Sequence, residues 1–198
     1  MRTGRLEAFS DGVLAIIITI MVLGLKVPAH STWGSLGDSV TTLLTYLLSF
    51  VYIGIYWNNH HHLFQLADRV NGVVLWANLH LLFWLSLYPF TTSWMDETDL
   101  AQIPVLVYGL NLLCAAIAFY VLQRAIVSAE GPDSRLQAAL GSDVKGKISP
   151  VIYTVGIFST FIAPWIGLAL FALVAAIWLV PDRRMERAIA AQEQLTDL

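Results

Sequence analysis

The chain of 198 residues is 57% hydrophobic and only 13% charged, with 11 basic residues, 14 acidic residues and a net charge of -3. Globular domains carry about 25% charged residues, which is about twice the share found here. The mean hydropathy is high, at +0.67. This composition excludes a cytosolic globular domain, a disordered tail and a nucleic-acid-binding protein, and it predicts an all-α integral membrane protein. The single cysteine, Cys114, lies in an apolar run, which excludes a disulfide framework or a cysteine metal cluster.

Apolar segments long enough to cross a bilayer recur along the chain. A hydrocarbon core about 30 Å thick needs about 20 apolar helical residues. Four such segments are predicted, at residues 4–27, 36–57, 70–94 and 103–127. A fifth apolar stretch, 148–180, is broken at Ala163-Pro164, and the residue before a proline disfavours helical geometry. We therefore predict two short helices there, 148–163 and 165–180, joined in a tight hairpin.

The placement of charges favours six transmembrane helices with both termini in the cytoplasm. Ten of the eleven basic residues then lie on the cytoplasmic side, and only Lys26 lies outside. A five-span alternative would place the basic cluster 183–187 outside, against the positive-inside rule. The acidic turn 96–99 falls on the outer side.

This topology predicts a multi-pass protein of the cell (inner) membrane. Residues 1–182 are expected to form a single transmembrane domain, and residues 183–198 a cytoplasmic tail. Tryptophans at the predicted span ends are typical of an interfacial aromatic belt; they are Trp33, Trp57 and Trp94.

The first predicted helix has two different faces. At about 100° per residue, Ile16, Ile20 and Leu23 share one aliphatic stripe, Gly12 continues it, and Thr19 borders it. The carboxylates at positions 7 and 11 point to roughly the opposite side, where neighbouring helices could satisfy them. Ionisable residues within a span are costly and usually functional. An aliphatic stripe at this period also occurs where a helix merely packs against a neighbour or faces lipid.

The start of this helix resembles a known family signature. Arg5-x-x-x-Phe9-Ser10-Asp11 is similar to the R-x-x-x-F-S-D motif of the endosomal and lysosomal potassium channel family (transmembrane protein 175) and its bacterial relatives. The similarity continues through Gly12-Val13-x-Ala15-Ile16-x-Ile18-Thr19 and extends over the whole chain in length, spans and loop positions.

The resemblance implies a homotetramer of six-span subunits, in which the first helix of each subunit lines a central cation pore. It implies a constriction at Ile16, further pore layers at Ile20 and Leu23, and a hydroxyl beside the constriction at Thr19. It also implies that the signature residues form a polar network near the cytoplasmic side, more structural than conducting. Those residues are Arg5, Phe9, Ser10 and Asp11.

Such a stripe offers neither a charged ring nor a carbonyl lining, so the expected selectivity device is a hydrophobic constriction. A cation would pass it by shedding part of its water, which favours potassium over sodium by a moderate factor. The expected partners are identical subunits, the lipid bilayer and permeant monovalent cations, with potassium ions as the permeant species and no cofactor.

Other polar residues fall in or near the second and third spans. Three consecutive histidines, 60–62, suggest a metal site, but successive helical residues point about 100° apart and cannot converge on one ion. We therefore expect network histidines and no metal, and His60 could pair with His80 on the next helix. The candidate partners for the signature residues are Trp57, Asn58, His60, Asn78 and His80.

Alternative functions remain open from the sequence. A secondary solute or ion transporter usually shows internal repeats and helices broken at mid-membrane, and we expect the only proline break between apolar helices at Pro164. A small membrane enzyme would rest on the histidine cluster, but no catalytic motif is present. Small residues such as Gly54 and Gly109 are expected at helix contacts.

Overall fold

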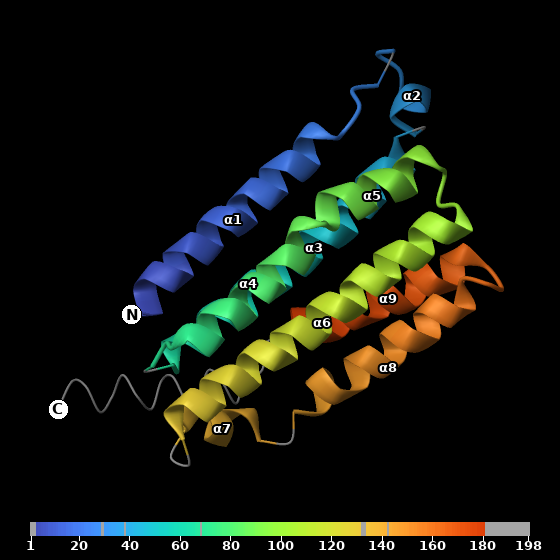
Figure 1. Cartoon of the computed structure of the whole chain (residues 1–198). Helices are drawn as coiled ribbons and strands as arrows, with labels where there is room; N and C mark the ends of the chain where they lie inside the picture. The colour runs from blue at the N-terminus through green and yellow to red at the C-terminus, as the bar shows by residue number, and fades with distance from the viewer. Residues whose placement is uncertain are drawn as a thin grey trace.

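The computed structural model describes residues 3–28, 30–37, 39–67, 69–131, 134–141 and 143–180. These residues form an all-helical bundle (Figure 1). Its elements are α1 (Thr3–Leu23), α2 (Trp33–Gly37), α3 (Val40–Gln65), α4 (Gly72–Ser86), α5 (Tyr88–Glu97), α6 (Gln102–Glu130), α7 (Arg135–Leu140), α8 (Val144–Ser159) and α9 (Pro164–Leu179). The predicted tail, 183–198, lies outside the described residues.

Four helical segments of the described chain are long and apolar enough to cross a membrane. They are α1, the α2–α3 segment Trp33–Gln65, the α4–α5 segment Gly72–Glu97, and α6. They overlap the four long spans predicted from the sequence. The last two helices have 16 residues each, or about 24 Å at 1.5 Å per residue, which is shorter than a hydrocarbon core of about 30 Å.

The third long segment is broken, and the expectation of a single proline break at Pro164 is wrong. Helix α4 ends at Ser86 and α5 begins at Tyr88, with Leu87 between them. Pro89 lacks the N–H that would bond to the carbonyl of Leu85, and its ring crowds that carbonyl, which breaks the regular helical ladder. At the break, the Leu87 N–H bonds to the Trp84 carbonyl, three residues back, at 3.3 Å, and not to the carbonyl four residues back as in a regular α-helix.

The last two helices form a hairpin. Helix α8 ends at Ser159, a turn follows, and Pro164 occupies the start of α9, where a proline has no helical N–H bond to lose. Glycines permit close packing around the buried ring of Phe171: a Cβ at Gly109 would lie 2.3 Å from Phe171 Cζ, and one at Gly156 2.6 Å from Cε1. The expected packing role fits Gly109, whereas Gly54 has no neighbouring atom within 4 Å of such a Cβ.

Several predicted boundaries shift. Helix α1 ends at Leu23 instead of residue 27, and α8 spans Val144–Ser159 instead of 148–163. Helix α3 continues past residue 57 to Gln65, so the three histidines lie within its last turns. Helix α6 runs to Glu130 instead of residue 127, and the segment between α6 and α8 contains the short helix α7, whose N-cap Ser134 accepts a bond from the Gln137 N–H at 3.2 Å. Polar residues lower the mean hydropathy of a sequence segment, so they end a predicted span, but they do not end the helix itself.

Helix α1 lies at the edge of the bundle. It packs against α3, α4 and α5, whereas α6, α8 and α9 pack on one another on the far side of those helices (Figure 1). The apolar core runs continuously between these layers and includes Leu14 of α1, Tyr52 of α3, Leu81 of α4 and Leu112 of α6. One side of α1 is therefore left uncovered by the rest of the chain.

Candidate functional site

The uncovered side of α1 is aliphatic. Ile16, Ile20 and Leu23 are 58%, 51% and 83% exposed in the single chain. The opposite side of α1 is buried against α3, α4 and α5; its buried residues are Leu6, Ser10, Leu14, Ile17 and Met21. We call the exposed residues 12, 16, 19, 20 and 23 the α1 face. An apolar face of this length must lie against lipid, pack against another copy of the chain, or itself line a pore.

Two further residues of the α1 face are small or polar. A Cβ at Gly12 would meet no atom within 4 Å, so this position is open. The Thr19 hydroxyl donates to the Ile16 carbonyl at 2.8 Å. That bond occupies the only hydroxyl proton and leaves the oxygen lone pairs of Thr19 free on an exposed part of the helix.

Two of the four signature residues also lie on the exposed side. Phe9 is 53% exposed, and Arg5 is exposed and forms no ion pair with any described residue. At about 100° per residue, both project to the same side as Ile16. The expectation of one buried network containing all four signature residues therefore does not fit this chain taken by itself.

Ser10, the third signature residue, lies in a buried network that joins three helices. Its hydroxyl donates to the Leu6 carbonyl at 2.9 Å and accepts from Asn78 Nδ2 at 2.9 Å. Asn78 Oδ1 in turn lies 2.8 Å from His60 Nε2. With Nδ2 donating to Ser10, Asn78 Oδ1 is an acceptor, so His60 Nε2 carries the proton. Ser10 and Asn78 are fully buried, which makes this network a strong link between α1, α3 and α4.

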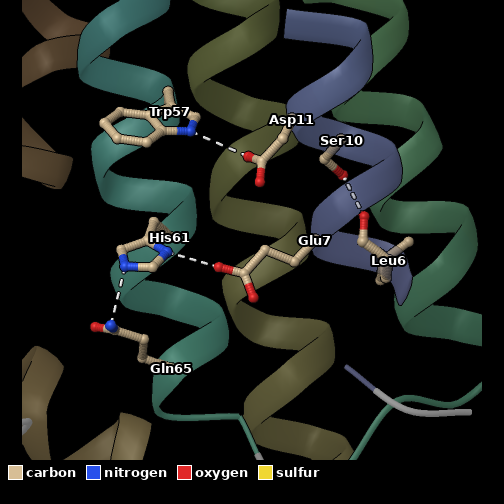
Figure 2. Close-up of polar contacts among 7 residues, drawn as sticks. All are labelled: Leu6, Glu7, Ser10, Asp11, Trp57, His61 and Gln65. Carbon is tan, nitrogen blue, oxygen red and sulfur yellow. Dashed lines mark hydrogen bonds and ion pairs between the residues drawn. The ribbon is translucent and has the colours of Figure 1, made fainter. Parts of the chain in front are cut away.

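A second set of polar contacts lies on the adjacent side of α1 and faces α3 (Figure 2). Trp57 Nε1 donates to Asp11 Oδ1 at 3.1 Å. One turn away, Glu7 Oε1 lies 2.6 Å from His61 Nδ1, and His61 Nε2 lies 2.9 Å from Gln65 Nε2. The His61 and Trp57 rings are stacked, with an interplanar angle of 13°. Helix α1 is thus held to α3 by two carboxylates spaced four residues apart.

Sequence reasoning missed the contact between Glu7 and His61. The signal was available, because Glu7 and Asp11 are four residues apart on one helix and Trp57 and His61 are four apart on another. Residues at this spacing share a face, so one pairing between the helices implies the second.

The remaining candidates do not join these contacts. Asn58 is half-buried and forms no side-chain hydrogen bond to a described residue. The predicted pairing of His60 with His80 is wrong, because His80 is exposed and accepts from Trp84 Nε1 at 3.0 Å. His80 and Trp84 are four residues apart on α4 and form this bond within one helix. Across the described ranges, no group of three or more His, Cys, Asp or Glu side chains gathers as a metal site would require.

The two sides of α1 therefore have different chemistry. One side is anchored through carboxylate, hydroxyl, amide and imidazole groups, and the other presents aliphatic side chains and one hydroxyl. Together with the membrane-length helices, this arrangement defines a multi-pass membrane protein with an uncovered, mainly apolar face along its first helix.

Comparison with known proteins places the chain in a family. Residues 5–89 match the family described as "Endosomal/lysosomal potassium channel TMEM175". A potassium channel of Chryseobacterium sp. is 54% identical over 189 residues, covering 96% of this chain and 98% of that one. The chain belongs to the TMEM175 family, which is a family of ion channels and not of enzymes.

More distant relatives agree with this assignment. A potassium channel of Chamaesiphon minutus is 33% identical over 189 residues, covering 87% of this chain and 91% of that one. The fold is similar to the crystal structure of a lysosomal potassium-selective channel TMEM175 homologue from Chamaesiphon minutus, with a TM-score of 0.75 and 31% identity. That match covers 91% of this chain and 97% of the solved chain.

Proposed function

We propose that this chain forms a potassium-permeable cation channel, in which the α1 face of each subunit lines a central pore. Ile16 forms the narrowest ring, Ile20 and Leu23 form the next layers, and the Thr19 hydroxyl lies beside the constriction. Potassium ions are the permeant species, and no cofactor takes part. The named potassium channels among the relatives support this assignment.

One observation carries the proposal. The α1 face is half or more exposed at its large aliphatic residues, while the opposite side of the same helix is anchored by buried polar bonds. A helix that faced lipid on that side would need no such fixed rotation. A pore-lining helix does, because a rotation of one residue position would replace Ile16 by a neighbouring side chain.

A single α1 cannot enclose a pore, so several copies must meet around an axis. We propose four identical subunits with six spans each, the short hairpin helices α8 and α9 included, and both termini on the cytoplasmic side of the inner membrane. This arrangement accounts for the uncovered side of α1 at the edge of the bundle (Figure 1).

The proposed pore selects by dehydration. At 1.5 Å per residue, the Ile16 and Ile20 rings lie about 6 Å apart and the Ile16 and Leu23 rings about 10 Å apart. A ring of branched aliphatic side chains offers no ligand to replace water, so an ion crosses it only after losing part of its hydration shell. Potassium loses water more easily than sodium, which gives a moderate preference for potassium. The stacked outer rings lengthen the dry stretch and supply a closed gate by dewetting.

The polar contacts set the rotation of α1. Asn78 fixes Ser10, and Trp57 fixes Asp11, on sides of the helix away from the proposed pore. The network then acts on conduction through the position of Ile16, without contacting the ion. Arg5 and Phe9, which project to the pore side, are proposed to line its cytoplasmic entrance or to contact a neighbouring subunit.

The test is to replace Ile16 with asparagine and to measure reversal potentials in mixed potassium and sodium. We expect higher conductance and a loss of the preference for potassium, because the amide replaces water at the constriction. Val22→Asn is the matched control: it lies on the same helix and is exposed, but at about 120° from Ile16 at 100° per residue. Equal effects of the two substitutions, or no effect of Ile16→Asn, would remove Ile16 from the pore.

A secondary transporter is the second candidate, and one observation favours it. The break between α4 and α5 at Pro89 falls inside a membrane-length segment, as do the broken helices of transporters. Recordings in planar bilayers separate the two functions. Unitary current steps support a channel, whereas saturable flux coupled to a counter-ion supports a transporter.

A further inference from the structure

A narrow slot lies between the helices on the side of the bundle away from α1, and it is open at one side, where the lining residue Tyr120 is 55% exposed. It runs between α3, α6, α8 and α9, and its lining residues extend seven positions along each of the first three helices. At 1.5 Å per residue, this is about 10 Å of depth. No residue of α1 lines the slot. Its lining includes Tyr56, Asn59, Gln123, Asp143, Ser149 and Trp178.

Two buried polar side chains line the slot without partners. Gln123 is 7% exposed and Tyr56 is 8% exposed. Within the described part of the chain, neither the Gln123 amide nor the Tyr56 hydroxyl forms a side-chain hydrogen bond. Buried polar groups are nearly always bonded to protein, water or a ligand. The polar atoms of both groups keep some accessible surface, so water or a hydrated ion in the slot can satisfy them.

The size of the slot limits that occupant. Its volume is about 50 Å³. A water molecule needs roughly 10–15 Å³ by this measure, which leaves room for roughly three to five waters. Organic ligands of drug size occupy pockets of about 300 Å³ or more. The slot therefore suits water alone or a small ion with part of its hydration shell.

The free groups at the polar end of the slot are mainly acceptors. Asn59 donates its amide N–H to the Ile55 carbonyl at 2.7 Å, so its oxygen remains. Ser149 donates its hydroxyl proton to the Lys145 carbonyl at 2.8 Å and accepts from Trp178 Nε1 at 2.8 Å, which leaves its oxygen one lone pair. Asp143 caps α8 by accepting from the Gly146 N–H at 3.0 Å, and a carboxylate has further lone pairs to offer.

No cation of the described residues neutralises Asp143 by an ion pair. Lys145, two positions away, bonds to the Val180 carbonyl at 2.7 Å, and its Nζ lies 5.9 Å from the centroid of the Trp178 ring. The Trp178 ring is thus already paired with the Lys145 ammonium and is not available to a second cation. The groups that remain to recognise a positive charge in the slot are the Asp143 carboxylate and the amide oxygens of Asn59 and Gln123.

We propose that this slot is a hydrated binding site for one small monovalent cation of the size of potassium or ammonium. Water bridges the cation to Gln123 and Tyr56, and Asp143 supplies the negative charge. The site is separate from the α1 face, so it stands whether or not that face lines a pore. Asn59 places it on the same helix as Trp57 and His61, which contact α1.

Silver ion provides a probe of the right size and charge. Cys114 is the only cysteine, so Cys114→Ser gives a thiol-free background. In the assembled protein, Ala116→Cys places a thiol in the slot. Ile117→Cys, one residue further and 47% exposed on the outer surface of the bundle, is the matched control. Modification is followed by intact mass or by the loss of maleimide-reactive thiol, with nitrate salts throughout.

We expect Ag⁺ to modify the thiol at position 116 about tenfold faster than the one at 117, because the reaction needs a thiol in contact with water. Potassium nitrate or ammonium nitrate should slow the reaction at 116, whereas N-methyl-D-glucamine nitrate at the same ionic strength should not. Asp143→Asn should reduce both the rate and the protection. Gln123→Leu, which leaves the α8 cap intact, should remove the protection as well.

Three results would overturn the proposal. Equal rates at 116 and 117 would mean that the slot is closed to water. Fast modification at 116 without protection by any monovalent cation would mean that the slot holds water only. Protection that survives both Asp143→Asn and Gln123→Leu would place the cation elsewhere.

Discussion

Asn78 is the residue whose loss the structure predicts to cost most within the polar network. It is fully buried and bonds to Ser10 on α1 and His60 on α3. Leucine is similar in shape but cannot form either bond. Asn78→Leu therefore removes two interhelical hydrogen bonds and leaves the His60 Nε2 proton without a partner.

The expected magnitude follows from these losses. Interhelical hydrogen bonds within membranes contribute about 0.6 kcal/mol each on average, and a buried donor without a partner costs about 1–3 kcal/mol. The sum is about 2–4 kcal/mol of unfolding free energy. For a chain of this size, about 2–4 °C of melting temperature corresponds to each kcal/mol. We expect a loss of about 5–15 °C.

The assay is thermal unfolding of the purified protein in detergent, followed by tryptophan fluorescence, with titration by a denaturing detergent to give free energies. Asn58→Leu is the matched control, because Asn58 is half-buried and makes no side-chain hydrogen bond to a described residue. That change should alter the unfolding free energy by less than about 0.5 kcal/mol. A double-mutant cycle with Ser10→Ala should give a coupling of about 0.6–1.7 kcal/mol.

Either of two results would contradict this role of Asn78. Asn78→Leu and Asn58→Leu could prove equally stable, or the Ser10 and Asn78 substitutions could add with a coupling below about 0.3 kcal/mol. Either result would show that the network does not tie α1 to its neighbours.

Further substitutions test packing and charge. Gly109→Ala should lower the unfolding free energy by about 1–3 kcal/mol because the new methyl group meets Phe171, and Phe171→Leu in the same chain should restore part of it. Gly54→Ala, where the added methyl meets nothing within 4 Å, should instead raise stability by about 0.5–1 kcal/mol; the opposite order in thermal unfolding would contradict both expectations. Glu7→Gln removes the carboxylate that lies 2.6 Å from His61 Nδ1; the side chains of Glu7 and His61 are 24% and 41% exposed. Its effect should stay below about 1 kcal/mol and shrink further in high salt, and a larger loss that persists in salt would show that the pair is shielded from water.

The sequence predicted the main division of α1 into two sides because that division depends only on helical periodicity. Leu14 and Ile17 are buried and Ile16 and Ile20 are exposed at positions that a helical wheel separates. The hairpin of α8 and α9 was likewise readable from Pro164, since a proline has a definite effect on the residue before it. Whether the Ile16 side lines a pore stays a prediction.

Partner choice was less predictable. The carboxylate of Asp11 needed a donor, but whether Trp57, Asn58 or His60 supplies it depends on the rotation of α3, which hydropathy does not encode. The break at Pro89 was visible in the sequence, yet an apolar window tolerates a proline and reports one continuous span. The contact between Glu7 and His61 needed the same rotational information as the contact of Asp11.

The polar contacts of α1 are concentrated in its first half. Among the described residues, Glu7, Ser10 and Asp11 form hydrogen bonds to other helices, whereas the second half of α1 forms no side-chain hydrogen bond to another helix. Helix α1 is therefore held most firmly near Ser10, and a tilt of the helix would pivot about that point. A tilt of about 5° about that point moves Ile16 by about 0.8 Å and Leu23 by about 1.7 Å at 1.5 Å of rise per residue. In the proposed channel, the same small tilt would displace the Leu23 ring about twice as far as the Ile16 ring, so the outer end of the pore would change width more than the constriction.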